Sequence, residues 1–188
     1  MSGEIPQQPE IEKTPESRLF DVDAMSNEQI TVLWRSLAGT AYQLCEAQSQ
    51  DQSASEALDV CDGLWQSLVR EMHSFALCNP EQAKDLIERS FRSLESLDRE
   101  FAARVAPSLI DFDYKFTRDV MVYLNVSSNH LGGLAGGTWS EIAWDCTSVL
   151  MRDRLTPEQI NDFNAHLTAH GEEHELDPAT PDMEYWNC

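Results

Sequence analysis

The sequence predicts an all-α fold, a single bundle-like domain of about five to six helices with acidic, flexible termini. Apolar residues recur at spacings of three and four through most of the chain, which is the period of a helix buried on one face. No segment alternates convincingly with the period of two that a strand requires. With 188 residues and 41% hydrophobic residues, the chain is large enough to form one hydrophobic core.

Composition divides the chain into three parts. Residues 1–25 are expected to form a flexible acidic arm, because they contain prolines and no hydrophobic period. Residues 26–170 form the helical domain, and residues 171–188 form an acidic C-terminal tail with six acids and no base. The two ends together carry half of the net charge of −20.

Capping patterns place the first two helices. Ser26 and Ser53 each begin a Ser-x-x-Glu/Gln pattern, the capping box that starts a helix. The helix after Ser53 has the most regular apolar stripe in the chain, with alternating spacings of four and three: Ala54, Leu58, Cys61, Trp65, Leu68, Met72 and Phe75. A helix in an antiparallel bundle buries such a stripe.

Two prolines delimit the third helix. Asn79 followed by Pro80 ends the second helix and starts the third, and Pro107 breaks the third helix. Between them, one helix is expected to carry inward residues from Ala83 to Val105, with Leu94 among them. Its other face alternates in charge sign, which is typical of a solvated surface with local ion pairs.

The remaining helices follow from the same period. The segment from Leu109 to Leu124 is apolar over much of its circumference, with Phe112 and Tyr123 on its stripe, so we expect a central helix. A fifth helix follows the glycine-rich segment described below. A sixth begins at the Thr156 capping pattern, and Gly171 ends it.

The acidity restricts the classes of partner. Direct nucleic-acid binding is not expected, because phosphate contacts need clustered Lys and Arg. Anionic membrane surfaces are disfavoured for the same reason, and the sequence shows no apolar run of spanning length and no signal pattern. The five cysteines form no CxxC pair. These features predict a cytoplasmic, reducing location.

The glycine-rich segment is the first candidate site. Half of the chain's glycines lie at 132–137, immediately before a capping pattern that starts a helix, and such a loop can hold an anion. Backbone donors, an imidazole for proton transfer and an indole wall would form the pocket: His130, Gly133, Gly136, Gly137, Trp139 and Asp145. The alternative, which we favour, is close helix packing at a sharp connection, since no phosphate-loop or dinucleotide motif is present.

Histidines form the second candidate. His166 and His170 are four residues apart, so on one helix they face one another, as in some zinc sites. Asp162 and His174 extend the same spacing, but Gly171 is expected to end the helix before His174. We therefore expect no metal, and we assign no cofactor. The interpretation that we favour is a position near a helix C-terminus, where a cation suits the dipole.

An acidic patch is the third candidate. Four acids surround the start of the second helix: Asp51, Glu56, Asp59 and Asp62. Asp59 and Asp62 lie about one turn apart, so they share a face. Such a patch could imitate a polyanion and cover a basic, nucleic-acid-binding surface of another protein. The simpler interpretation is that the charge only maintains solubility.

Two functions follow from these candidates. The hypothesis that we favour is a non-enzymatic acidic protein that binds another protein with a basic surface, as a regulator, inhibitor or adaptor. The alternative is a small enzyme or ligand-binding protein that uses the Gly132–Gly137 loop and the start of the following helix. A pocket joining His130, Trp139 and Asp145 would favour the alternative, whereas an acidic face with exposed aromatic residues would favour protein binding.

Overall fold

The computed structural model describes residues 19–48, 53–127, 137–171 and 176, and every regular element in them is helical. The all-α prediction is therefore confirmed. The α-helices are α1 (Asn27–Gln48), α2 (Ser53–Cys78), α3 (Pro80–Phe91), α4 (Ser96–Val105), α5 (Tyr114–Ser127), α6 (Gly137–Cys146) and α7 (Pro157–Ala169). Shorter helical segments are η1 (Val22–Ala24), η2 (Ala106–Leu109), η4 (Thr147–Met151) and η5 (Arg152–Arg154). None of the helices described here is long and apolar enough to cross a membrane.

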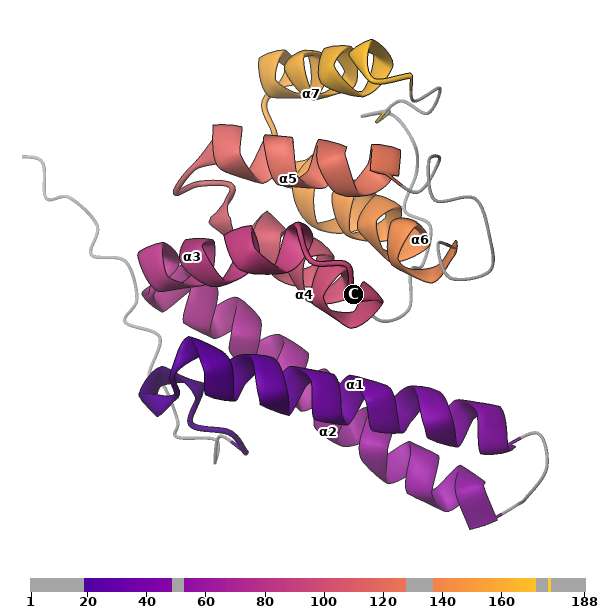
Figure 1. Cartoon of the computed structure of the whole chain (residues 1–188). Helices are drawn as coiled ribbons and strands as arrows, with labels where there is room; N and C mark the ends of the chain where they lie inside the picture. The colour runs from indigo at the N-terminus through magenta and orange to yellow at the C-terminus, as the bar shows by residue number, and fades with distance from the viewer. Residues whose placement is uncertain (1–18, 49–52, 128–136, 172–175, 177–188) are drawn as a thin grey trace, which may run out of the picture.

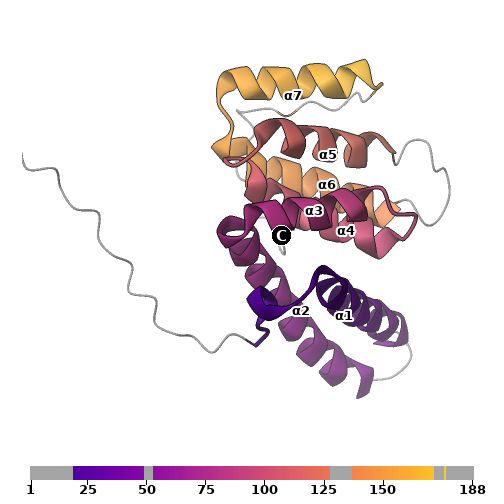
Figure 2. The same cartoon turned by 60° about the vertical axis from the view of Figure 1, so that its left-hand side comes forward.

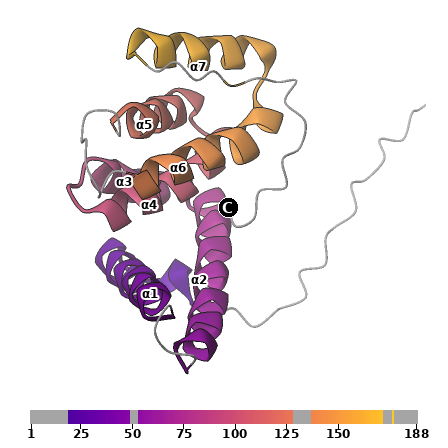
Figure 3. The same cartoon turned by 90° about the vertical axis from the view of Figure 1, so that its right-hand side faces the viewer.

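The helices stack in layers. An antiparallel pair, α1 and α2, forms one end, and α7 lies over α5 at the other end (Figures 1 and 2). In a third view, α2 runs from its pairing with α1 toward the layer of α3 and α4 (Figure 3). The short helix α4 contacts α1, α2, α3, α5 and α6, and its residues from Asp98 to Val105 are all buried. The centre of the fold is therefore α4.

An aromatic cluster joins the first layer to this central helix. The Trp34 ring centroid of α1 lies 4.1 Å from that of Trp65 on α2 and 4.9 Å from that of Phe101 on α4. The indole Nε1 of Trp34 donates a hydrogen bond of 2.9 Å to the Leu97 carbonyl. Aromatic rings at these separations stabilise the fold by more than the burial of their apolar area alone. The stripe predicted for α2 is buried from Cys61 to Phe75, with Trp65 in the cluster, whereas Leu58 is only half-buried.

The prediction of one continuous third helix is wrong, because the chain forms two helices there, α3 and α4, with a turn between them. Ser93 forms the turn: its Oγ accepts from the Glu95 N–H at 3.1 Å, and its carbonyl accepts from Arg99 Nε at 2.7 Å. Short polar side chains that bond to the local backbone compete with helix formation. Leu94, expected on the buried face, is 93% exposed as a result.

The fourth predicted helix begins later than expected. After η2 the chain turns, and α5 starts at Tyr114 because the Asp113 carboxylate accepts from the Phe116 N–H at 3.0 Å, a side-chain cap. Phe112 therefore precedes the helix and is exposed, contrary to the expected stripe. Tyr123 is also exposed, although its ring packs edge-on against Phe91.

The last helix matches its prediction. Thr156 and Gln159 form a complete capping box, and Gly171 follows the helix with a φ of 83°, a left-handed conformation that glycine adopts without strain. Leu176 is buried beyond that end. The Asn164 side chain holds it by accepting from the Leu176 N–H at 2.9 Å and donating to its carbonyl at 3.0 Å.

Candidate functional site

A cavity of about 380 Å³ lies between α1, α2 and α4, and we name it the acidic groove. Residues from all three helices line it: Ala38, Ala41, Tyr42, Cys45, Leu58, Asp59, Asp62, Trp65, Glu100 and Arg104. Three carboxylates and one guanidinium are among them. The volume is within the range of about 300–1,000 Å³ that is usual for ligand pockets.

The period of α2 places two of the predicted acids on this groove. Trp65 and Leu68 face the core, and Leu58 is half-buried one turn before the stripe enters it. Asp59 and Asp62 are exposed at the edge of the stripe and line the cavity. Because helical residues three apart lie on the same face, both carboxylates lie along one rim.

The two other predicted acids stand apart from the groove. Glu56 is exposed on the first part of α2 but does not line the cavity, and Asp51 lies outside the described residues. Only Asp59 and Asp62 therefore reach the groove among the described members of the predicted patch.

The opposite wall contains a buried polar network. Glu100 is 3% exposed and accepts from Arg104 Nε at 3.0 Å and from the Tyr42 hydroxyl at 2.9 Å. The Arg104 guanidinium also lies over the Trp65 ring, 5.7 Å from its centroid. Burial, together with the Glu100 charge, raises the pKa of the Tyr42 phenol, which therefore stays protonated and donates. Sequence reasoning missed Tyr42 and Glu100, which are 58 residues apart in the chain.

The glycine-rich candidate falls largely outside the described residues. His130, Gly133 and Gly136 lie outside the described residues. Gly137 is the first residue of α6, which continues through Trp139, and the structure describes only their helical backbone. Asp145 is half-buried near the end of α6. The pocket that would join His130, Trp139 and Asp145 stays a prediction.

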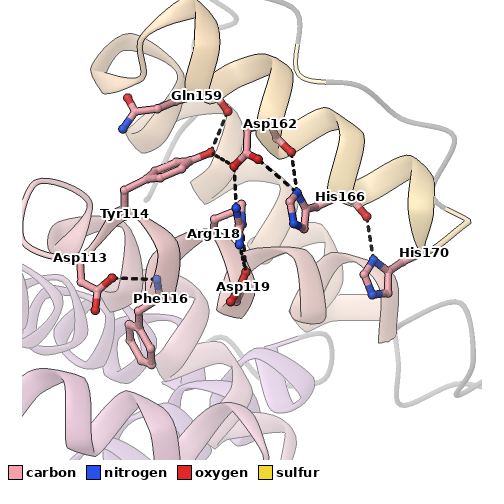
Figure 4. A network of polar contacts seen from close by, with 9 residues as sticks. All are labelled: Asp113, Tyr114, Phe116, Arg118, Asp119, Gln159, Asp162, His166 and His170. Atoms are coloured by element: carbon pink, nitrogen blue, oxygen red, sulfur yellow. Dashed lines mark hydrogen bonds and ion pairs between the residues drawn. The ribbon is translucent and has the colours of Figure 1, made fainter.

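The histidine pair, His166 on α7 and His170 at its C-cap, lies beside another cavity of about 380 Å³ between α5 and α7. Figure 4 shows both rings on the side of α7 that faces α5. The Nδ1 atom of each ring bonds the carbonyl four residues earlier, at 2.8 Å for His166 and 2.7 Å for His170. Because a carbonyl only accepts, Nδ1 carries the hydrogen, and the lone pair of the neutral ring is on Nε2.

The possible third ligand, Asp162, is engaged elsewhere (Figure 4). Its Oδ2 accepts from Arg118 Nη1 at 2.7 Å and from the Tyr114 hydroxyl at 2.9 Å. The Arg118 hydrogen bond lowers the pKa of Asp162 below its usual value. In the part of the chain that the structure describes, no group of three or more His, Cys, Asp or Glu side chains could hold a metal. The Asp162 network fastens α7 to α5, and the absence of a metal stays a prediction.

A histidine and a serine form a contact that no spacing in the sequence indicated. His73 on α2 and Ser108 in η2 lie with Nδ1 and Oγ 2.7 Å apart, and Ser108 is buried. This is the geometry of a base and a nucleophile. The contact gives the buried Ser108 hydroxyl a hydrogen-bond partner and joins α2 to η2, and neither residue lines the acidic groove.

His73 is expected to make stability depend on pH. Burial lowers its pKa, and the charges of Arg104 and Arg154 lower it further, so the folded protein favours the neutral ring. This contribution to stability is complete above the unfolded-state pKa of about 6.5 and is lost as pH falls through that value toward the folded-state pKa. Urea unfolding of His73→Gln between about pH 7.5 and 5 should show a weaker pH dependence than wild type.

The control for this experiment is His170→Gln, which removes an exposed histidine at the C-cap of α7. The comparison uses the slope of the unfolding free energy against pH, so a uniform loss of stability in either variant does not affect it. An unchanged slope in His73→Gln would contradict the expected role of the buried ring.

Comparison with known proteins identifies no family. No protein-family model, no curated protein and no solved structure matches the chain. Function is therefore inferred from the geometry of the described residues.

Proposed function

We propose that this protein binds another protein through the acidic groove, which receives a basic segment of the partner. The observation that carries this proposal is the position of Asp59 and Asp62 on the rim of a cavity with aromatic walls. A carboxylate pair on a convex surface would provide only long-range attraction. Beside a cavity, the same pair can direct a side chain into a space lined by Tyr42 and Trp65.

The charges in the groove support a cationic occupant. Arg104 lies between the Glu100 carboxylate and the Trp65 ring, so its charge is partly compensated within the wall. Asp59 and Asp62 are exposed and keep their hydration before binding. A Lys or Arg side chain of the partner would meet these two carboxylates, and the Tyr42 ring offers a cation–π contact. We infer that the protein acts on that partner as a regulator, inhibitor or adaptor.

Imitation of a polyanion is the narrower form of this proposal. It applies if the basic segment is also the surface by which the partner holds nucleic acid. A polyanion such as heparin would then compete with this protein for the partner. If the complex is insensitive to heparin, imitation of a polyanion is rejected.

Charge reversal in the groove tests the proposal. Asp59→Lys combined with Asp62→Lys introduces repulsion on the rim, so binding to a captured partner should weaken by at least about tenfold. The matched control is Glu81→Lys with Glu158→Lys, which changes the net charge equally at exposed positions on α3 and α7. The dissociation constant of each variant should be measured at about 50 and 500 mM salt.

The outcomes separate groove binding from general charge attraction. In the proposed mechanism the groove variant loses most of the binding, the control loses little, and added salt weakens the wild-type complex. An equal loss in both variants would mean that only the net charge matters. Binding that salt leaves unchanged would reject an electrostatic groove altogether.

A further inference from the structure

A second large cavity, of about 630 Å³, lies between α1, α3 and the start of α4. Its walls contain three arginines, Arg35, Arg89 and Arg92, and we name it the arginine cleft. The chain has only ten arginines and three lysines against 33 acids, so three arginines in one cavity are a local concentration of positive side chains. The cleft shares no lining residue with the acidic groove.

Arg35 is the fixed member of the three. Its Nε and Nη2 donate to the two oxygens of Asp98 at 2.7 and 2.6 Å, and Asp98 is buried. Burial alone would raise the pKa of Asp98, but hydrogen bonds from Arg35 and Ser93 lower it below its usual value, so the carboxylate stays ionised. This two-point contact orients the guanidinium and leaves its Nη1 group outside the pair.

Arg89 and Arg92 are the adaptable members. Arg89 lies in the last turn of α3 and Arg92 is its C-cap residue, still with helical backbone angles, so the two side chains lie on one face. Each has an acid four residues earlier: Arg89 Nη2 lies 2.9 Å from Asp85, and Arg92 Nη2 lies 3.6 Å from Glu88. All four of these side chains are about half exposed or more, and exposed ion pairs of this spacing contribute little to stability. An incoming anion can therefore replace either acid at little cost.

We propose that the arginine cleft binds a small organic anion through a phosphoryl or carboxylate group. The planar guanidinium offers two parallel N–H donors to such an oxyanion, which the lysine ammonium does not. The cleft is the size of a small-molecule site, and Leu86 and Val32 provide apolar wall for the carbon part of the ligand. Among the lining residues, the three arginines face two acids, Glu28 and Asp98. Asp85 and Glu88, the acids that pair with Arg89 and Arg92, do not line the cleft, so an anion inside it meets more cationic than anionic side chains.

Titration of the full-length protein with inorganic phosphate and with glutarate tests this site. The readout is the NMR signals of the arginine Nε–H groups at constant ionic strength, with chloride as the reference anion. We expect saturable shifts for the arginines of the cleft with at least one probe, and a dissociation constant of about 1 mM or below. Saturation with phosphate alone assigns a phosphoryl ligand, and saturation with glutarate alone assigns a carboxylate ligand.

Neutral variants identify the residues. Arg89→Gln with Arg92→Gln should weaken the binding at least tenfold. Arg70→Gln with Lys115→Gln, which removes the same charge from exposed positions on α2 and α5, should leave it within about twofold. If the first variant does not fold, Arg89→Lys with Arg92→Lys replaces it; it keeps the charge, loses the guanidinium fork and should still weaken binding severalfold. Shifts that match those of chloride, or an equal loss in the control, would overturn the site.

Discussion

Trp34→Ala is expected to lower the free energy of unfolding by about 4–5 kcal/mol, near the upper end for a buried aromatic residue. Trp34 is 1% exposed and contacts Trp65 and Phe101, so its removal leaves a cavity where α1, α2 and α4 meet. The Leu97 carbonyl also loses its donor. Losing this hydrogen bond costs about 1–3 kcal/mol where no water molecule can take the place of the indole N–H.

The measurement is guanidinium unfolding followed by far-ultraviolet circular dichroism, because tryptophan fluorescence changes with the substitution itself. Trp34→Phe separates the two causes, since it keeps an aromatic ring and removes the N–H donor. We expect this variant to lose roughly half as much stability as Trp34→Ala. A loss below about 1 kcal/mol for Trp34→Ala would show that the three helices do not meet at this ring.

Glu100→Ala is expected to lower the free energy of unfolding by about 3 kcal/mol, because removing one partner of a buried ion pair leaves the other charge poorly compensated. The Arg104 guanidinium loses the acceptor of its 3.0 Å hydrogen bond, and the Tyr42 hydroxyl loses its acceptor as well. Replacing both partners by apolar residues, as in the double variant Glu100→Leu with Arg104→Met, should restore most of the stability that Glu100→Ala loses. Urea unfolding of Glu100→Leu, of Arg104→Met and of the double variant forms the cycle that measures the coupling between the two side chains.

The control for this cycle is the exposed pair of Glu88 and Arg92, which has the same spacing of four residues. Glu88→Ala should change stability by less than about 0.5 kcal/mol, since water already screens that pair. Comparable losses for Glu88→Ala and Glu100→Ala would mean that burial of the Glu100 carboxylate does not determine its energetic role.

The sequence predicted the helices best where their ends are set by neighbouring residues. The capping box at Thr156 and the glycine at 171 determine α7 through hydrogen bonds and a backbone conformation within a few residues. The apolar stripe of α2 likewise depends only on the helical period. The prediction failed at Ser93, where several local hydrogen bonds compete with the helix, and the docking of α4 against α1 and α2 accompanies the break.

Each candidate site likewise combines features that the sequence predicts with features that only the tertiary structure decides. That Asp59 and Asp62 share a face follows from the sequence alone, because residues three apart in a helix are neighbours. Only the tertiary structure decides that they border a cavity, since Tyr42 and Glu100 on its other wall come from α1 and α4. The arginine cleft also depends on tertiary packing, because Arg35 and Asp98, which form a hydrogen bond in it, are 63 residues apart in the sequence. Charge and helical period are local properties that a sequence displays, whereas a cavity exists only once distant helices have packed together.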